Sequence, residues 1–95
     1  MKTPREIAAE AGIEWIGQIG QVSAAALEAI PRPLAYRYSV MPLELEDKRL
    51  RVALANPFDF DVIDALSKEL RYEVEPVVAP SGEIVRALIH YYGEL

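Results

Sequence analysis

The chain has 95 residues, 52% of them hydrophobic and 26% charged, which is the composition of one small globular domain and not of a disordered segment. Fifteen acidic and ten basic residues give a net charge of -5, and the basic residues are scattered along the chain, which argues against a nucleic-acid-binding protein. The absence of cysteine excludes disulfides, thiolate nucleophiles and cysteine-based zinc sites, and a single histidine excludes a histidine-rich metal site.

No apolar run approaches the roughly 20 residues needed to cross a bilayer, and the N-terminus MKTPREIAAEAG has no signal-peptide core. We therefore expect a soluble cytoplasmic protein with no direct membrane insertion. Residues 1–95 are expected to form a single domain, because a chain of this length can bury only one core.

The first predicted helix begins after Thr3, which can cap it and is followed by proline and, three residues after the cap, by Glu6. This spacing is a capping box. Gly12 can take the left-handed conformation that ends a helix. Residues 14–16 are then predicted to be extended, with Trp15 as a packing residue.

Two more short helices are predicted before residue 40. Ser23 can cap a helix over residues 24–30, where alanine and leucine favour helix and the following proline ends it. Pro33 suits the first turn of the next helix. Residues 17–20, with the sequence GQIG, have the G-x-x-G form that KH domains use against nucleic-acid backbones, but they lack basic residues, so a flexible connector is expected.

A β-hairpin is predicted from residues 40–46 and 49–55, because apolar and polar residues alternate in both segments. Pro42 places the first strand at an edge or at a bulge, since proline cannot donate a ladder hydrogen bond. The turn between them, Asp47 and Lys48, lacks the glycine that a two-residue loop prefers at the position of Lys48. A longer loop is therefore expected.

The second half continues with a helix, a strand over residues 73–79 and a last helix that Ser81 is expected to cap. A strand-helix-strand connection within one sheet is nearly always a right-handed parallel crossover, so the strands near Val52 and Val77 should run parallel. The predicted fold is α+β, with a small three-stranded mixed sheet (β-hairpin, helix, parallel strand, helix) and short N-terminal helices packed on it.

The stretch LRVALANPFDFDVIDAL, residues 50–66, has the strand-turn-helix order found at many phosphate-binding sites. It contains neither glycine nor lysine, and its three aspartates would repel a phosphate. Their expected role is structural: Pro57 sets the turn, Asp59 caps the helix and Asp61 favours the helix dipole. A calcium or magnesium site formed by these two aspartates with Asp64 is the alternative.

No residue in the sequence is predicted to be catalytic. His90 has no serine, cysteine or second titratable group placed beside it by sequence, so a surface histidine is expected rather than a general base. No enzyme and no cofactor is therefore predicted, and a domain of this kind is expected to act by binding another protein.

The segments IPRPLAYRYSVMPLELEDKRLRVALANPFDFDVIDAL and YEVEPVVAPSGEIVRALIHYYG together resemble the N-terminal domain of the type II secretion and type IV pilus assembly ATPases, the general secretory pathway protein E family. In that family an Ala-x-x-Tyr helix leads to an x-Pro-Leu strand, an Ala-x-Pro-x-Asp turn and a Val-Glu-Pro strand. The matching residues are Ala35, Tyr38, Pro42, Leu43, Ala55, Pro57, Asp59, Val74, Glu75, Pro76, Tyr92 and Gly93.

The resemblance implies a non-catalytic domain that docks the ATPase onto the cytoplasmic portion of an inner-membrane platform protein. It also implies that ATP and magnesium belong to a separate ATPase domain, which would be a second partner, and that the protein is cytoplasmic and peripheral to the inner membrane. The chain would then be part of a longer protein; a small full-length relative is the alternative.

Two departures from the family pattern qualify the resemblance. Glycine is common in the family where Lys48 stands, and where Arg71 or Tyr72 stands, so these two turns are expected to differ in shape. One branch of the family binds cyclic di-GMP through a leucine-spaced motif that begins with Arg-Leu-Gly, and the N-terminus has no such motif. A cyclic di-GMP-sensing domain is therefore the alternative function.

The partner-binding residues are expected among the N-terminal helices and residues 33–38, where arginine and aromatic residues are mixed. Trp15, Arg32 and Arg37 are the candidates.

Overall fold

The computed structural model describes residues 1–56 and 58–94. Within them the predicted α+β order is confirmed. The elements are α1 (Pro4–Ala11), β1 (Glu14–Trp15), α2 (Ala24–Ala29), α3 (Arg32–Tyr38), β2 (Met41–Glu46), β3 (Arg49–Leu54), α4 (Phe60–Leu70), β4 (Glu73–Val78) and α5 (Ser81–Tyr92).

The strands form one mixed sheet in the order β1-β4-β3-β2. β2 and β3 are the antiparallel hairpin, and β3 and β4 run parallel with Ala53 opposite Val77, which confirms the predicted crossover. The sheet has one strand more than the three predicted. The additional strand is β1, which pairs parallel with β4 at the edge through Glu14 and Trp15.

The hairpin follows the sequence pattern except at its turn. β2 is an edge strand, and its register shifts between Pro42 and Glu44, so the proline lies both at an edge and at a bulge. Glu46 pairs with Arg49, so the loop has two residues and the longer loop expected from the sequence is wrong. Asp47 takes the positive φ of 54°, which aspartate tolerates better than most side chains. Glycine is therefore not required at Lys48.

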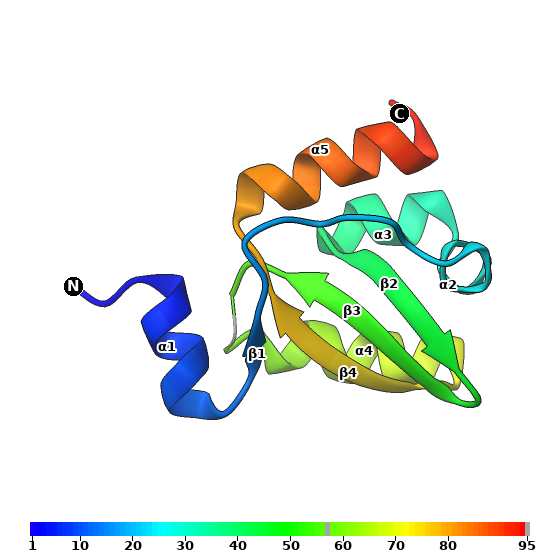
Figure 1. The fold of residues 1–95 in the computed structure, drawn as a ribbon. Coiled ribbons are helices and arrows are strands. Elements are labelled where there is room, and N and C mark those ends of the chain that lie inside the picture. The colour runs from blue at the N-terminus through cyan, green and yellow to red at the C-terminus, as the bar shows by residue number, and fades with distance from the viewer. Residues whose placement is uncertain (57, 95) are drawn as a thin grey trace.

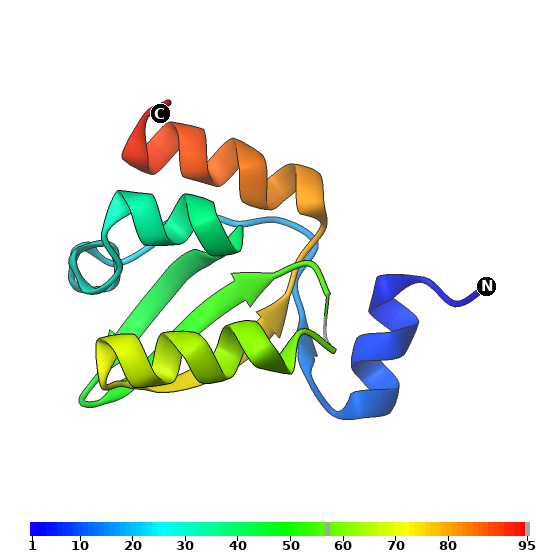
Figure 2. The same cartoon turned by 180° about the vertical axis from the view of Figure 1, so that it is seen from behind.

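The helices lie on different sides of the sheet. α4 covers one face and stands in front of the strands in Figure 2. α5 and α3 pack side by side beyond the end of the sheet where β3 and β4 finish, and α2 contacts the edge strand β2 (Figure 1). α1 stands apart from these helices and contacts β1 and β4. Among the residues that the structure describes, no helix lies over the strands on the opposite face of the sheet, which is turned to the viewer in Figure 1.

The core lies between the sheet and the helices that cover it. Leu50, Val52 and Leu54 of β3 are buried, as the alternation predicts, and Leu66 is the buried residue of α4. α5 buries Ile84, Ala87 and Leu88 and leaves two of its other apolar residues, Val85 and Ile89, exposed. No helix in the described ranges is long and apolar enough to cross a bilayer.

The ends of the first two helices form as predicted. Thr3 and Glu6 make the complete capping box, Gly12 ends α1 with a φ of 72°, and the Ser23 hydroxyl accepts from the Ala26 N–H at 3.0 Å. These caps depend only on residues close in sequence, which is why local spacing predicts them.

The later helix starts differ from the predictions. Ser81 is the first residue of α5 and Pro80 precedes it, so the predicted serine cap is wrong. Asp59 does precede α4, but its side chain makes no capping hydrogen bond, because its ψ of 61° departs from the extended backbone that aims such a side chain at the helix. The role predicted for Pro57 lies outside the described residues.

Candidate functional site

α5 holds the segment that joins β1 to α2. A Glu83 carboxylate oxygen accepts a hydrogen bond from the Ile19 N–H at 2.9 Å, and Arg86 Nη2 donates to the Ile19 carbonyl at 2.8 Å. The two side chains also form an ion pair at 3.0 Å. Ile19 is only 4% exposed. The expectation that the GQIG stretch is a flexible connector is therefore wrong at this residue.

The charged groups of this contact, Glu83 and Arg86, stabilise the fold. The hydrogen bond from Arg86, followed by that from the Ile19 N–H, holds the pKa of Glu83 below its usual value, and the pKa of Arg86 is raised for the reciprocal reason. Both groups stay charged near neutral pH. Because each group is already engaged by a protein partner, neither is poised for proton transfer.

Tyrosine hydroxyls near the end of α5 add further hydrogen bonds between distant segments of the chain. The Tyr92 hydroxyl donates to the Ile30 carbonyl at 2.8 Å, and burial raises the pKa of Tyr92 to about 12. The Tyr91 hydroxyl donates to the Gly20 carbonyl at 2.8 Å, and Tyr36 on α3 donates to the Gly93 carbonyl at 2.7 Å. These rings join distant parts of the chain and do not form a stacking platform for a base.

The three predicted partner-binding residues do not form one patch. Trp15 is half-buried on β1, at one edge of the sheet, whereas Arg32 and Arg37 are exposed on α3, which leads into β2 at the other edge. Arg32 Nη1 lies 3.4 Å from the Glu94 carbonyl oxygen, to which it donates. Their exposure leaves both arginines accessible to a partner, and their binding role stays a prediction.

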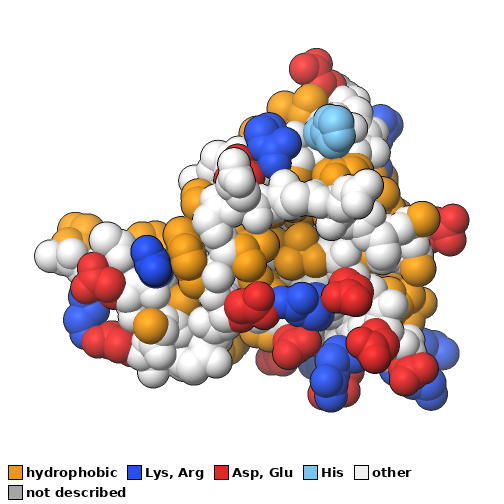
Figure 3. Space-filling view, viewed as in Figure 1, with side chains coloured by type: hydrophobic (Ala, Val, Ile, Leu, Met, Phe, Trp, Pro, Cys, Tyr) orange, Lys and Arg blue, Asp and Glu red, His pale blue; other side chains and the backbone are white. Residues whose placement is uncertain are grey.

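The face of the sheet opposite α4 carries a charged network. Arg51 is surrounded by three carboxylates: it pairs with Glu14, and its nitrogens lie 3.7 Å from a Glu44 oxygen and 3.8 Å from a Glu75 oxygen. Figure 3 shows charged side chains gathered over the strands on this face. The surplus of carboxylate makes the network unsuitable for an anion such as a phosphate.

The turn before α4 was the candidate phosphate or cation site. Asn56 Oδ1 accepts from the Phe58 N–H at 3.0 Å, and the Asn56 carbonyl accepts from the Asp59 N–H at 3.2 Å. These N–H groups are therefore used within the turn and are not free for an anion. Across residues 1–56 and 58–94, no three acidic or histidine side chains are arranged to hold a metal ion.

Two exposed aromatic rings, one in this turn and one at the first residue of α4, were not predicted from the sequence. Phe58 and Phe60 are 58% and 59% exposed, and their rings meet edge to face with centroids 6.4 Å apart. The apolar residues whose spacing predicts the helix are Val62, Ile63, Leu66 and Leu70. Phe60 is not among them, and this was the indication in the sequence that its ring is exposed.

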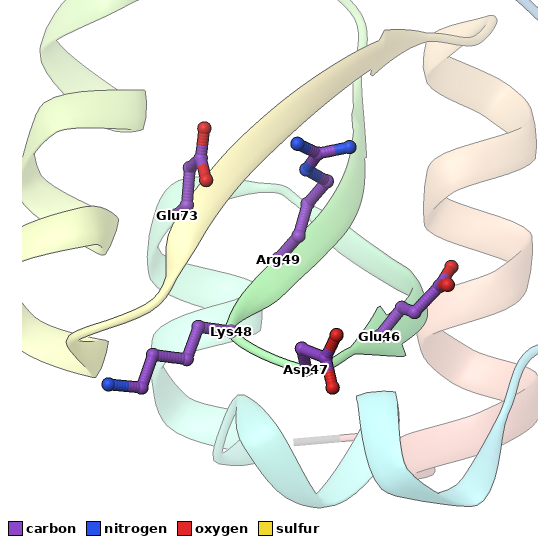
Figure 4. A pocket seen from close by; sticks show the side chains of 5 residues that line it. All are labelled: Glu46, Asp47, Lys48, Arg49 and Glu73. Atoms are coloured by element: carbon purple, nitrogen blue, oxygen red, sulfur yellow. The ribbon is translucent and has the colours of Figure 1, made fainter.

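A hollow at the end of the hairpin offers no enclosed site. It is lined by Glu46, Asp47, Lys48, Arg49 and Glu73, all of them exposed. In Figure 4 the Lys48 side chain points away from Arg49, and the two do not converge. His90, the candidate base, is exposed on α5 and stacks edge-on against Tyr91 at 4.7 Å.

Comparison with known proteins identifies the fold and the family. The chain resembles the structure of MshE with cdg, with 26% identity and a TM-score of 0.81, over 90% of this chain and 63% of the MshE chain. It also resembles the structure of the N-terminal domain of XpsE, with 18% identity and a TM-score of 0.73, over 95% of this chain and 67% of the XpsE chain. The XpsE likeness bears on the fold alone.

Curated relatives are much longer than this chain. The Escherichia coli K12 bacteriophage adsorption protein B is 29% identical over 87 residues, which are 90% of this chain and 12% of that protein. The type IV pilus assembly ATPase PilB of Thermus thermophilus is 33% identical over 70 residues, 68% of this chain and 8% of that protein.

The MshEN domain model matches residues 18–95, which is most of the chain. The match covers every element from α2 to α5 and leaves out α1 and β1. Together with the likeness to MshE and PilB, this match confirms the resemblance inferred from the ordered motifs, and with it a non-catalytic domain. The chain belongs to the MshEN domain family, and it is similar to the N-terminal domain of type II secretion and type IV pilus ATPases.

Proposed function

We propose that this domain docks a type II secretion or type IV pilus ATPase onto the cytoplasmic domain of an inner-membrane platform protein. The observation that carries the proposal is the MshEN match over residues 18–95 together with the similarity to PilB, which is named as an assembly ATPase. In this proposal ATP and magnesium act in the separate ATPase domain, and the domain is cytoplasmic and reaches the inner membrane only through its partner.

The surface of the domain supports binding of a protein over binding of a small substrate. The hollow at the hairpin in the described part of the chain is open and formed by exposed charged residues. Small-molecule sites are usually concave and mostly apolar. Arg32 and Arg37 present two guanidinium groups on the outside of α3, and arginine is a residue type enriched at interface centres.

Isothermal titration calorimetry with the platform protein's cytoplasmic domain tests the docking function. We expect saturable binding in the micromolar range, weakened at least about tenfold by the double substitution Arg32→Ala and Arg37→Ala. The double substitution Arg49→Ala and Lys48→Ala, at the far end of the hairpin, is the matched control for removing two positive charges. Failure to bind at tens of micromolar would count against the proposal.

Cyclic di-GMP sensing is the second candidate, because the similar MshE structure was determined with this ligand, named there as cdg. The Arg-Leu-Gly motif of the sensing branch is missing from this N-terminus, and the Asn56 turn uses its own N–H groups internally. A ligand that binds only the folded state raises the melting temperature. We expect cyclic di-GMP to leave it unchanged; a saturable rise would assign the sensing role to this domain.

A further inference from the structure

Phe58 and Phe60 form an apolar surface that the fold does not use. Both rings are more than half exposed, and neither belongs to the set of hydrophobic residues packed against the core. α4 instead buries Leu66 and packs Val62 and Ile63 against that core. Single exposed apolar residues are normal on protein surfaces, but two phenylalanine rings in mutual contact expose a continuous apolar area.

The charged residues closest to these rings in the sequence are all acidic. Between Arg51 and Lys68 the sequence contains three aspartates and no basic residue. Asp59 lies between the two rings in sequence and is half-buried, and Asp61 and Asp64 are exposed on the first turns of α4. A partner that covers the rings must therefore meet carboxylates at the margin of the contact.

The exposed rings and the aspartates beside them together indicate which kind of partner can bind this surface. A second copy of the same surface would bring like charges together, which opposes association. Anionic lipid and nucleic acid are disfavoured for the same reason. A segment with lysine or arginine beside aliphatic residues satisfies both features, because its cations can meet the aspartates or lie over the ring faces.

We propose that Phe58, Phe60 and the flanking aspartates are a docking surface for a cationic amphipathic segment of another protein. Two aromatic rings are the anchor of a small interface, so the complex is weak and reversible. The carboxylates set the orientation and the rate of encounter, and make binding sensitive to salt. This surface lies at the start of α4 and the arginines lie on α3, so the proposal does not depend on the docking function proposed above.

Nuclear magnetic resonance titration of the isotope-labelled chain tests this proposal. The probe is a helical peptide of leucine and lysine in heptads, and its counterpart has glutamate in place of lysine. We expect the lysine peptide to shift the amide signals of residues 58–64 saturably, and high salt to weaken it; the glutamate peptide should not shift them. Equal binding of both peptides, or shifts centred on another surface, would overturn the proposal.

Two matched pairs of variants localise the site. Phe58→Ser with Phe60→Ser should weaken the lysine peptide about tenfold or more, whereas Val85→Ser with Ile89→Ser, which also removes two exposed apolar side chains, should not. Equal weakening by the two pairs would contradict the proposal. So would self-association of the free protein that the phenylalanine variants abolish, because the occupant would then be a second copy.

The second pair separates the aspartates from the net charge. Asp61→Asn with Asp64→Asn should weaken the lysine peptide more than Glu44→Gln with Glu75→Gln, which changes the net charge by the same amount on the sheet face. An equal effect would show general attraction to an acidic protein and would overturn the proposed surface.

Discussion

Among single residues, Tyr92 shows most clearly how a side chain joins distant parts of the fold. Its hydroxyl donates to the Ile30 carbonyl at the end of α2, and Ile30 itself is fully buried. Tyr92→Phe keeps the ring and removes the donor, so we expect the free energy of unfolding to fall by about 1 kcal/mol. Urea denaturation followed by circular dichroism measures this. Tyr72→Phe, at a half-buried tyrosine, is the control and should change stability less.

The same residue predicts the response to high pH. In the unfolded chain Tyr92 ionises near its ordinary pKa of 10, whereas in the folded domain the pKa is about 12. Between these values the unfolded state loses a proton that the folded state keeps, so the contribution of Tyr92 to stability is complete below pH 10 and is lost as the pH rises to 12. Tyr92→Phe should flatten this loss; an unchanged pH profile would contradict it.

Glu83 predicts the opposite response at low pH. Its folded pKa is lowered by Arg86 and the Ile19 N–H, so its contribution is present above the ordinary value of 4.5 and is lost as the pH falls through the lowered pKa. Glu83→Ala should therefore speed hydrogen exchange at the Ile19 amide at neutral pH, and remove part of the acid sensitivity of the domain. Glu69→Ala, an exposed glutamate on α4, is the control. Unchanged exchange at Ile19 would mean that the contact does not hold the segment.

Among the helices and strands, local sequence predicts those features that depend on neighbouring residues. The capping box of α1, the Ser23 cap and the alternation of β3 are of this kind. β1 was predicted as extended but not as part of the sheet, because two residues cannot show an alternating pattern. Its place depends on pairing with β4, including the hydrogen bond from the Ile16 N–H to the Val78 carbonyl, which joins residues far apart in sequence.

The turns at Lys48 and Arg71 also have backbone conformations that the local sequence did not indicate, and they lead to a prediction. The family pattern has glycine near Lys48 and Arg71, but among these two only Arg71 takes a positive φ, of 59°, where it ends α4. Arg71→Gly should raise the free energy of unfolding by about 0.5–1 kcal/mol, because glycine adopts this conformation without strain at a helix end. Lys48→Gly should give no gain, since its backbone needs no such freedom. A gain at Lys48 equal to that at Arg71, measured by urea denaturation, would contradict this account.

Across the domain as a whole, the interaction surfaces were harder to predict than the fold. Composition selected Trp15, Arg32 and Arg37, but the order of the strands separates the first from the other two. The contact of Glu83 and Arg86 with Ile19 joins residues more than sixty positions apart, and no periodicity in the sequence indicates it. The exposed Phe58 has no periodic signal because it precedes α4.

The burial of side chains predicts that α1 is less stable than the rest of the domain. Ala8 is the only buried residue of α1 and lies outside the main core cluster, whereas Leu50 is fully buried within that cluster. Thr3→Ala should destabilise α1 by about 1 kcal/mol through loss of its cap, and should speed hydrogen exchange in α1 alone. Leu50→Ala should lower the free energy of unfolding by about 2–5 kcal/mol and speed exchange throughout the sheet.

Hydrogen exchange and urea denaturation of the two variants separate these levels. If α1 unfolds before the rest of the domain, Thr3→Ala leaves the global denaturation midpoint unchanged. The reason is that α1 is already unfolded in the state from which the rest of the domain unfolds cooperatively. Ala25→Gly, at an exposed position in α2, is a control for weakening a short helix that packs on β2, and it should lower the midpoint. A midpoint shift in Thr3→Ala as large as that in Ala25→Gly would show that α1 unfolds together with the core.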